Sequence, residues 1–446
     1  MTPVAGTTPR VRVVVVDYDG GDLTLRCLAA LTRTEWDADA LEIVVVDNGS
    51  SVSVAEQVRA ELPRVRIVRS ATNRGFAGGN NLALGDLDDF DFVALVNNDV
   101  TVEPGWLHPL VTALVDDERL GAAGPKVLFE DRYRRLELST AADAGGRLER
   151  RALGVRVSGV RVADDDRWSG TRFASGTWGP EWGPTGPFHW TTGDATILVP
   201  VARDTSDPAT CALRLDAPKP SEVVLTSDGD TLRATVADEP RWYPAPTSGP
   251  PFDVINSTGT EMTRDGHGID RGYLEEDRGQ YDTDTDMFGW YGGAVLLRTS
   301  YLDDVGPLDE RLFLYYEDLE LSLRGREAGW RYRYVPASVV RHRHAATSSR
   351  RWRDAAFYTE RNRLLVLARH AGGATATKAA ARFAATTLSY AWRDLVAPVG
   401  RGERPRPDYV VARARALGSF LAAAPGMLRS RTHSRSTLKR APSVDR

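Results

Sequence analysis

Four short apolar runs in the first hundred residues constrain the fold more than any other feature of this sequence. They cover residues 11–16, 43–46, 65–68 and 92–96. Each run is strand-sized, and polar or helix-periodic sequence separates it from the next, which is typical of buried strands. Strands that alternate with helices at this spacing predict a parallel sheet with right-handed crossovers. We therefore expect an α/β fold that begins near the N-terminus.

Acidic side chains follow three of these runs. Asp17 and Asp47 come directly after theirs, and Asp99 follows the fourth run together with Asn98. Because the carboxyl ends of parallel strands meet at one edge of a sheet, these groups should face a common ligand crevice. Carboxylates gathered there repel one another unless a cation or hydrogen-bond donors are present. Oxygen ligands of this kind suit Mg²⁺ or Mn²⁺ holding a diphosphate, although Asn and Asp also suit an ordinary turn.

Composition excludes several classes of protein. The 446 residues are 42% hydrophobic and 26% charged, which is ordinary for a globular chain, and the net charge of -4 argues against a nucleic-acid binder. The charge is unevenly distributed along the sequence, because residues 401–446 contain ten arginines and one lysine but three acids. Cys27 and Cys211 indicate no disulfide framework, and no apolar stretch reaches the length of a membrane span. We expect a cytoplasmic protein.

A glycine-rich segment, residues 73–81, opens a predicted helix. Its glycines, such as Gly79, let backbone approach a ligand closely, and Asn73 and Asn80 offer amides that can read a base or ribose. The spacing does not match the dinucleotide-binding fingerprint, so the segment by itself is a weak signal.

Together, the motifs VVVVDYDGG, IVVVDNGSS, NRGFAGGNN and ALVNNDV resemble the nucleotide-sugar half of a family 2 glycosyltransferase of the GT-A fold. The likeness is strongest to the bacterial rhamnosyltransferase-like and galactofuranosyltransferase-like branch. The resemblance implies nucleotide-sugar contacts from Asp17, Asp47, Asn73, Gly79, Asn80 and Asn98. It also implies that Asp99 is the metal-binding acid of a D-x-D-type motif. Two departures are Asp17, where the family commonly has Asn, and Asn97, which replaces the first acid of D-x-D.

Residues 136–250 follow another pattern. Runs at 195–201, 211–215, 222–226 and 231–236 alternate polar with apolar residues and are separated by Pro, Asp and Gly. This predicts an inserted antiparallel β unit, which we interpret as a sandwich. Its many Trp and Tyr residues either bind sugars as an accessory module or fill the core of the unit.

The resemblance resumes in residues 251–370, where the sequence WYGG is followed by an acidic pair. Trp290 stacks on an acceptor sugar or fills the core, and Gly292 and Gly293 let an acceptor lie close to backbone. Glu317 and Asp318 open a predicted helix whose dipole stabilises negative charge, and simple capping is the alternative. The pair resembles the family's E/D-D motif. The motif makes Asp318 the general base and Glu317 its neighbour at the acceptor hydroxyl.

Two histidines follow in the run VVRHRH, where a strand places His342 and His344 on one face. Family members have a His hereabouts that can join the cation, usually about five residues before a hydroxyl residue. Thr347 fits that spacing, so the resemblance favours His342 as a metal ligand. A phosphate-contacting or exposed His remains the alternative.

Residues 371–446 are Ala-rich and helical in pattern, with apolar stripes and many arginines. Such helices lie on an anionic membrane face, or pack on the body or on a partner. The chain thus divides into a nucleotide-sugar half (1–135), an inserted β domain (136–250), an acceptor-binding half (251–370) and C-terminal amphipathic helices with a basic tail (371–446).

These features predict an inverting, metal-dependent glycosyltransferase. Its donor would be a nucleoside diphosphate sugar such as dTDP-rhamnose, and its acceptor a hydroxyl of a bacterial cell-surface or lipid-linked glycan. We expect it at the inner face of the plasma membrane. A sugar-phosphate nucleotidyltransferase is a rival, although such enzymes usually carry a basic glycine-rich loop where residues 17–22 are acidic. A non-catalytic glycan-binding protein is the other rival, and the pair Glu317 and Asp318 argues against it.

Overall fold

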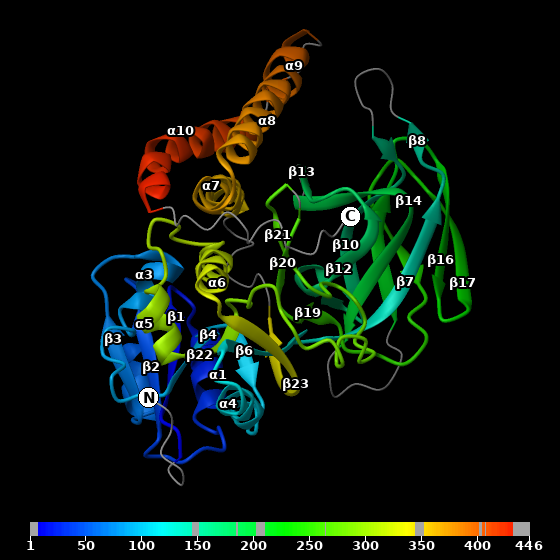
Figure 1. Ribbon diagram of the computed structural model, residues 1–446. Helices are drawn as coiled ribbons and strands as arrows, with labels where there is room; N and C mark the ends of the chain where they lie inside the picture. The colour runs from blue at the N-terminus through cyan, green and yellow to red at the C-terminus, as the bar shows by residue number, and fades with distance from the viewer. Residues whose placement is uncertain are drawn as a thin grey trace. The chain divides into compact units, whose positions relative to one another are not determined.

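The computed structural model describes residues 8–144, 151–183, 186–201, 210–263, 265–343, 352–400, 404–405 and 407–430. These residues form two compact units. Figure 1 colours the chain by residue number, from blue at the N-terminus to red at the C-terminus. The first, here called the catalytic unit, takes in the chain up to residue 128, residues 256–273, and residue 279 onward. The second, the inserted unit, comprises residues 129–255 and 274–278.

The catalytic unit is built on a nine-stranded sheet within the described residues, with β3, β2, β1 and β4 side by side and parallel. Its strands are β1 (Val11–Asp17), β2 (Leu41–Asp47), β3 (Val65–Arg69), β4 (Phe92–Asn97), β5 (Val100–Val102), β6 (Leu120–Phe129), β19 (Ile255–Ser257), β22 (Ala294–Arg298) and β23 (Arg331–His342). The strand β22 runs antiparallel to β4. The predicted α/β class and its mostly parallel sheet are confirmed, with all four early strands in place.

Helices cover both faces of this sheet (Figure 1). They are α1 (Asp22–Leu31), α2 (Ala55–Glu61), α3 (Gly75–Asn81), α4 (Leu107–Asp116), α5 (Thr299–Val305) and α6 (Glu317–Ala328). Successive strand residues point to opposite faces, so Val13 and Val15 enter one buried cluster while Val14 enters the other. Burial on both faces explains why the early strands read as continuous apolar runs.

The register of the strands brings their polar ends to one edge. Asp17 stands opposite Asp47 on the neighbouring strand, and Val16 stands opposite Asn97. The strand ends that carry Asp17, Asp47 and Asn97 therefore lie at one edge of the sheet, as the sequence predicted.

The inserted unit is antiparallel, as predicted, but it is not a sandwich of two sheets. Its described strands form one ten-stranded sheet with a main path β17-β16-β7-β14-β10-β15-β18. The strands on this path are β7 (Arg132–Thr140), β10 (Arg156–Val162), β14 (Gly186–Val201), β15 (Cys211–Asp216), β16 (Ser221–Ser227), β17 (Asp230–Val236) and β18 (Arg241–Ala245). The outermost strands β17 and β18 contact each other, so the sheet curls around its own core. The prediction erred because alternation shows that a strand has one buried face, not whether that face meets a second sheet.

Aromatic side chains of the inserted unit divide between core and surface. Trp168 packs against the core cluster, whereas Trp178 and Trp242 are 36% and 39% exposed. The structure is therefore compatible with both interpretations of the Trp-rich insert, sugar binding by surface aromatic residues and filling of the core.

The C-terminal part is helical, as expected, and belongs to the catalytic unit by its contacts. It contains α7 (Trp352–His370), α8 (Gly373–Ala391), a π-helical segment η3 (Trp392–Val396), α9 (Ala397–Gly400) and α10 (Asp408–Arg429). Leu365, Phe383, Ala416 and Phe420 form its core together with Leu312. No helix in the described part of the chain is long and apolar enough to cross a membrane.

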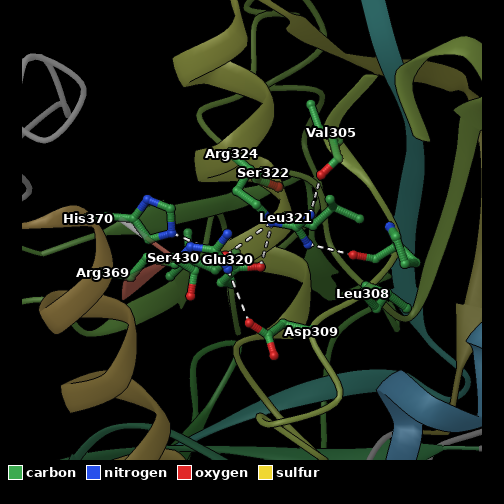
Figure 2. A network of polar contacts seen from close by, with 12 residues as sticks. Val305, Leu308, Asp309, Glu320, Leu321, Ser322, Arg324, Arg369, His370 and Ser430 are labelled. Carbon is green, nitrogen blue, oxygen red and sulfur yellow. Dashed lines mark hydrogen bonds and ion pairs between the residues drawn. The ribbon is translucent and has the colours of Figure 1, made fainter. Parts of the chain in front are cut away.

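A buried ionic network joins α6 to α7 (Figure 2). Glu320 is fully buried, and its carboxylate accepts from Arg324 at 3.0 Å and lies 2.6 Å from Arg369 and 3.2 Å from His370. Burial alone would raise the pKa of Glu320, but the hydrogen bond from His370 and the charges of its cationic neighbours lower it to about 2. Glu320 thus remains ionised and holds α6 against α7 at neutral pH.

We predict that Glu320→Gln lowers the free energy of unfolding by about 3–5 kcal/mol, because it strands buried cations without their carboxylate. Chemical denaturation of the variant and the wild type measures the difference. Arg382→Gln is the control, since its ion pair with Asp265 is exposed and should contribute at most about 1 kcal/mol. Equal effects of the two substitutions would contradict the importance of the network.

Candidate active site

Asp17 ends β1 and is fully buried. Its carboxylate accepts hydrogen bonds from Thr24 Oγ1 at 2.6 Å, Gly20 N at 3.1 Å and Ser50 Oγ at 3.1 Å. Asn98, another predicted nucleotide contact, donates to Thr24 Oγ1 at 3.0 Å. These bonds fix the loops that follow β1, β2 and β4 relative to one another at the ligand edge.

Asp47 stands beside Asp17 and is also held by local donors. It accepts from Ser53 Oγ at 2.6 Å and from Ser50 N at 3.0 Å, and Arg69 Nε lies 3.4 Å away. A cavity of about 450 Å³ adjoins this strand end, lined by Gly49, Ser50, Arg69, Ser70 and Ala71. The sheet edge thus carries an open hollow next to one of the predicted nucleotide residues.

The glycine-rich segment lies at the same edge but presents its predicted side chains differently. Asn73 Oδ1 accepts from Gly75 N at 2.8 Å, which shapes the turn into α3. Asn80 is 1% exposed and donates to Phe76 O at 2.9 Å within its own helix. A Cβ at Gly79 would come within 2.7 Å of Val16, so this glycine lets α3 pack closely on β1. In the structure Gly79 packs against β1, and the amide of Asn80 is buried against α3.

Asp99 and His342 are brought together by strand pairing. Asp99 immediately precedes β5, and β5 runs antiparallel to β23 with His342 opposite Val100. As a result, His342 Nε2 lies 2.9 Å from Asp99 Oδ1. The other ring nitrogen, Nδ1, lies 2.9 Å from Asn256 Oδ1 and 3.1 Å from the Tyr291 hydroxyl. The two predicted metal ligands therefore meet.

This pair fits a divalent cation. When Nδ1 donates to Asn256, Nε2 is the ring atom left to face a cation, with its orientation fixed, as in many metal-binding histidines. Among the described residues no group of three His, Cys, Asp or Glu side chains surrounds one point. Mg²⁺-type sites commonly use one or two protein ligands and complete the shell with substrate phosphates and water. His344, the alternative ligand, lies outside the described residues.

Asp318 and Glu317 open α6, as predicted. Asp318 is half-buried, and it accepts from Gly292 N at 2.9 Å and from Leu319 N at 2.7 Å. Glu317 is buried, and its Oε2 has no hydrogen-bond partner among the residues that the structure describes. Burial and then the charge of Asp318 raise the pKa of Glu317 to about 8. Burial also raises the pKa of Asp318, but its backbone donors favour the ionised form. The pair therefore keeps its proton on Glu317 and its charge on Asp318.

Two consecutive residues link the metal-ligand pair to the acidic pair. The Tyr291 hydroxyl contacts His342, which contacts Asp99, while the next residue, Gly292, donates to Asp318. Burial, together with the charges of Asp270, Asp99 and Asp318, raises the pKa of Tyr291 well above its usual value. Asp99 and Asp318, 219 residues apart in the sequence, thus converge on one site around Tyr291.

The predicted acceptor contact of Trp290 is wrong. Trp290 is 0% exposed and belongs to the core beneath the sheet, so its indole fills space and no sugar reaches it. Its neighbour Tyr291 occupies the site because the side chains of adjacent residues point in different directions. Gly292 N donates to Asp318, and Gly293 O accepts from Asn97 N at 2.9 Å, which connects this turn to the end of β4.

Sequence reasoning gave no role to Asn256 and Asp270, and it considered Tyr291 only as a sugar-stacking or core residue beside Trp290, although all three line the site. Burial and the neighbouring Asp318 raise the pKa of Asp270 to about 7, while a hydrogen bond from Ser257 opposes this rise. Asn256 is buried beside His342. A signal existed in the polar sequence NSTG at residues 256–259, which is too polar for a buried strand without a special reason.

The comparisons agree with these motifs. Residues 12–161 match the family model for glycosyl transferase family 2. A curated relative, the N-acetylglucosaminyl-diphospho-decaprenol L-rhamnosyltransferase of Mycobacterium tuberculosis, is 44% identical over 63 residues, 14% of this chain and 20% of the relative. The succinoglycan biosynthesis protein ExoO of Rhizobium meliloti is 29% identical over 130 residues, 29% of this chain and 35% of the relative. This chain therefore spans about a fifth to a third of these relatives.

Solved structures give only a weak likeness. A mannosyltransferase from Pyrobaculum calidifontis in complex with GDP-Man and Mn²⁺ has 14% identity and a TM-score of 0.39, covering 95% of this chain and 90% of its own. A score this low carries no argument about function. The sequence match is the firmer finding: residues 12–161 match the family 2 glycosyltransferase model, and the resemblance of the motifs is confirmed.

We predict that Asp99→Asn weakens Mn²⁺ binding by at least roughly tenfold, and that Asn256→Ala weakens it by about 10–100-fold through the orientation of His342. Calorimetric titration with Mn²⁺ alone measures both effects. Asp303→Asn, an exposed acid on α5, is the control. Unchanged Mn²⁺ affinity in Asp99→Asn would remove this pair from metal binding.

Proposed function

We propose that this protein is an inverting glycosyltransferase, which transfers a sugar from a nucleoside diphosphate donor to a hydroxyl group of a glycan. The observation that supports this most is the position of Asp318. It is a half-buried carboxylate, held by two backbone N–H groups, next to a metal-ligand pair at the ligand edge of the sheet. No second function has comparable support.

Asp318 serves as the general base. A base must be ionised and within hydrogen-bond reach of the proton that it accepts. The backbone donors keep Asp318 charged, and its partial exposure lets an alcohol approach. Asp318 takes the proton while the acceptor oxygen attacks the sugar carbon from the face opposite the leaving diphosphate. A single displacement of this kind inverts the configuration and requires no covalent intermediate.

Asp99 and His342 would hold Mg²⁺ or Mn²⁺, and Asn256 and Tyr291 would orient the imidazole. When bound, such a cation offsets negative charge on the leaving diphosphate. The loops around Asp17 and Asp47 would receive the nucleoside beside the cavity lined by Arg69, and Asn73 would shape the adjoining turn. The nucleobase and the sugar of the donor are proposed by analogy with the rhamnosyltransferase relative, and this analogy favours dTDP-rhamnose.

A lipid-linked acceptor would suit the C-terminal helices. Leu388, Trp392, Val396 and Val399 are 73%, 58%, 58% and 63% exposed and follow one another along α8, η3 and α9. Spacings of three and four residues keep such side chains on one helix face. The following sequence is strongly basic, so this face would bind an anionic membrane surface and hold the protein near its acceptor.

We predict that Asp318→Asn lowers the transfer rate by at least about 10²-fold, the usual contribution of a general base, without weakening nucleotide binding. Transfer is assayed with a panel of nucleoside diphosphate sugars, and binding by calorimetry with the matching nucleoside diphosphate. In the wild type the rate should fall as the pH drops through the raised pKa of Asp318, because only the ionised acid accepts a proton. Asp303→Asn is the control. Full turnover by Asp318→Asn would refute its role as the base.

We predict that the double substitution Trp392→Ser and Val396→Ser weakens binding to vesicles containing phosphatidylglycerol by at least roughly tenfold, because it removes exposed apolar area that the membrane would bury. Flotation of the protein with vesicles measures this. Trp242→Ser provides the matched control, since it removes an exposed Trp from the inserted unit. Equal vesicle binding by all variants would contradict the membrane contact.

A further inference from the structure

The segment that leads into α6 is strained. Phe313, Tyr315 and Tyr316 adopt positive φ angles of 65°, 69° and 71°, which bulky residues rarely accept. Conformations of this kind persist only where the surroundings fix them. The segment ends at Tyr316, directly before Glu317 and Asp318. Its backbone path therefore decides where α6 begins and where the base stands.

One side chain of α7 holds this segment. Asn362 is 0% exposed, and its Nδ2 donates to Leu312 O at 2.7 Å, Leu314 O at 2.9 Å and Tyr315 O at 2.8 Å. Its Oδ1 accepts from Arg361 Nη1 at 2.8 Å. Because the NH₂ group has only two hydrogens, at least one of them is shared between two of the three carbonyls. A single amide thus binds three carbonyls of the strained turn.

The opposite side of the same turn reaches the glycine-rich segment. Phe313 O accepts from Phe76 N at 2.6 Å and from Ala77 N at 3.4 Å. Both donors lie in the first turn of α3, next to Gly75. A Cβ at Gly75 would come within 2.2 Å of Phe313 O, and its φ of 73° also favours glycine. This glycine is required for the turn and α3 to touch.

The main ionic network between α6 and α7 does not replace this contact. Glu320 lies in the first turn of α6, and its carboxylate binds that turn to Arg369 and His370 of α7 (Figure 2). The strained turn before the helix is bound to α7 by other contacts, the hydrogen bonds of Asn362. The start of α6 is thus fixed both by the ionic network around Glu320 and by the hydrogen bonds of Asn362.

We propose that Asn362 is a positioning residue that couples the glycine-rich segment to the base. By fixing the carbonyls of Leu312, Leu314 and Tyr315, it keeps Phe313 O against the backbone of α3 and Asp318 at the start of α6. A structural change in the glycine-rich segment is transmitted to the start of α6 through this turn, and a change at the start of α6 is transmitted back in the same way. The catalytic meaning of the coupling rests on the proposed function, whereas the coupling itself does not.

Hydrogen exchange by mass spectrometry tests the coupling in the full chain. In Asn362→Ala, peptides covering residues 74–79 and 312–320 should exchange at least roughly tenfold faster than in the wild type, because Phe76 N loses its fixed acceptor. A peptide covering residues 41–47 in β2 should not change. The matched control is Thr387→Val, which removes a buried hydroxyl of α8 that accepts from Arg413 and should alter neither region.

Two results would overturn the proposal. Unchanged exchange at residues 74–79 would show that Asn362 does not act beyond its own turn, and faster exchange at 41–47 as well would indicate general destabilisation. Should Asn362→Ala fail to fold, Asn362→Ser keeps one donor and should show the same pattern with a smaller change.

Adding UDP, dTDP or GDP with Mn²⁺ separates this proposal from the proposed function. In the wild type we expect the bound nucleoside diphosphate to slow exchange at residues 312–320, and Asn362→Ala should lose this remote effect. Remote slowing that persists in Asn362→Ala would overturn the coupling role. If none of the three slows exchange at residues 74–79 in the wild type, the donor assignment fails, and the variant comparison without nucleotide still decides the coupling.

Discussion

The antiparallel pairing of β5 with β23 is the constraint on which the site depends. It places Asp99 within 2.9 Å of His342, although 243 residues separate them. Strand register leaves little freedom here, because a shift by one residue would turn His342 to the opposite face. The neighbouring contacts of Asn256 and Tyr291 with the same imidazole then fix its ring plane. The backbone hydrogen bonds of the strand pairing thus fix the relative position of Asp99 and His342.

The acidic pair at the start of α6 shows how environment separates two similar groups. Glu317 is buried, with its Oε2 unpaired in the described part of the chain, whereas Asp318 accepts from two backbone N–H groups. Like charges so close cannot both persist, so the better-solvated acid takes the charge. The strained turn before the helix is consistent with such a site, since strained backbone often accompanies function. The positive φ angles of this turn cost stability, and the hydrogen bonds of Asn362 to the same turn offset that cost.

Local pattern predicted the parallel strands, because each buried run carries its own signature in the sequence. The convergence of Asp99, His342 and Asp318 was predicted from the resemblance of the motifs and from the rule that the carboxyl ends of parallel strands meet at one edge of a sheet. The orientation of Trp290 was not, because neighbouring residues of one turn divide between core and site according to distant packing. The helix-packing role of Gly79 and the single curled sheet of the inserted unit likewise depend on tertiary contacts that periodicity does not encode.

The insertion has a consequence for biosynthesis. Ribosomes add roughly 5–20 residues per second, so about 12–50 s pass between the emergence of Asp99 and that of His342. During this interval β4 has one edge unpaired until its neighbour β22 (Ala294–Arg298), which lies beyond the insert, has also emerged. A nascent chain in this condition exposes an apolar strand, which invites aggregation or chaperone binding. Early closure of the inserted unit around its own core would limit that danger by removing its hydrophobic surface from the unfinished polypeptide.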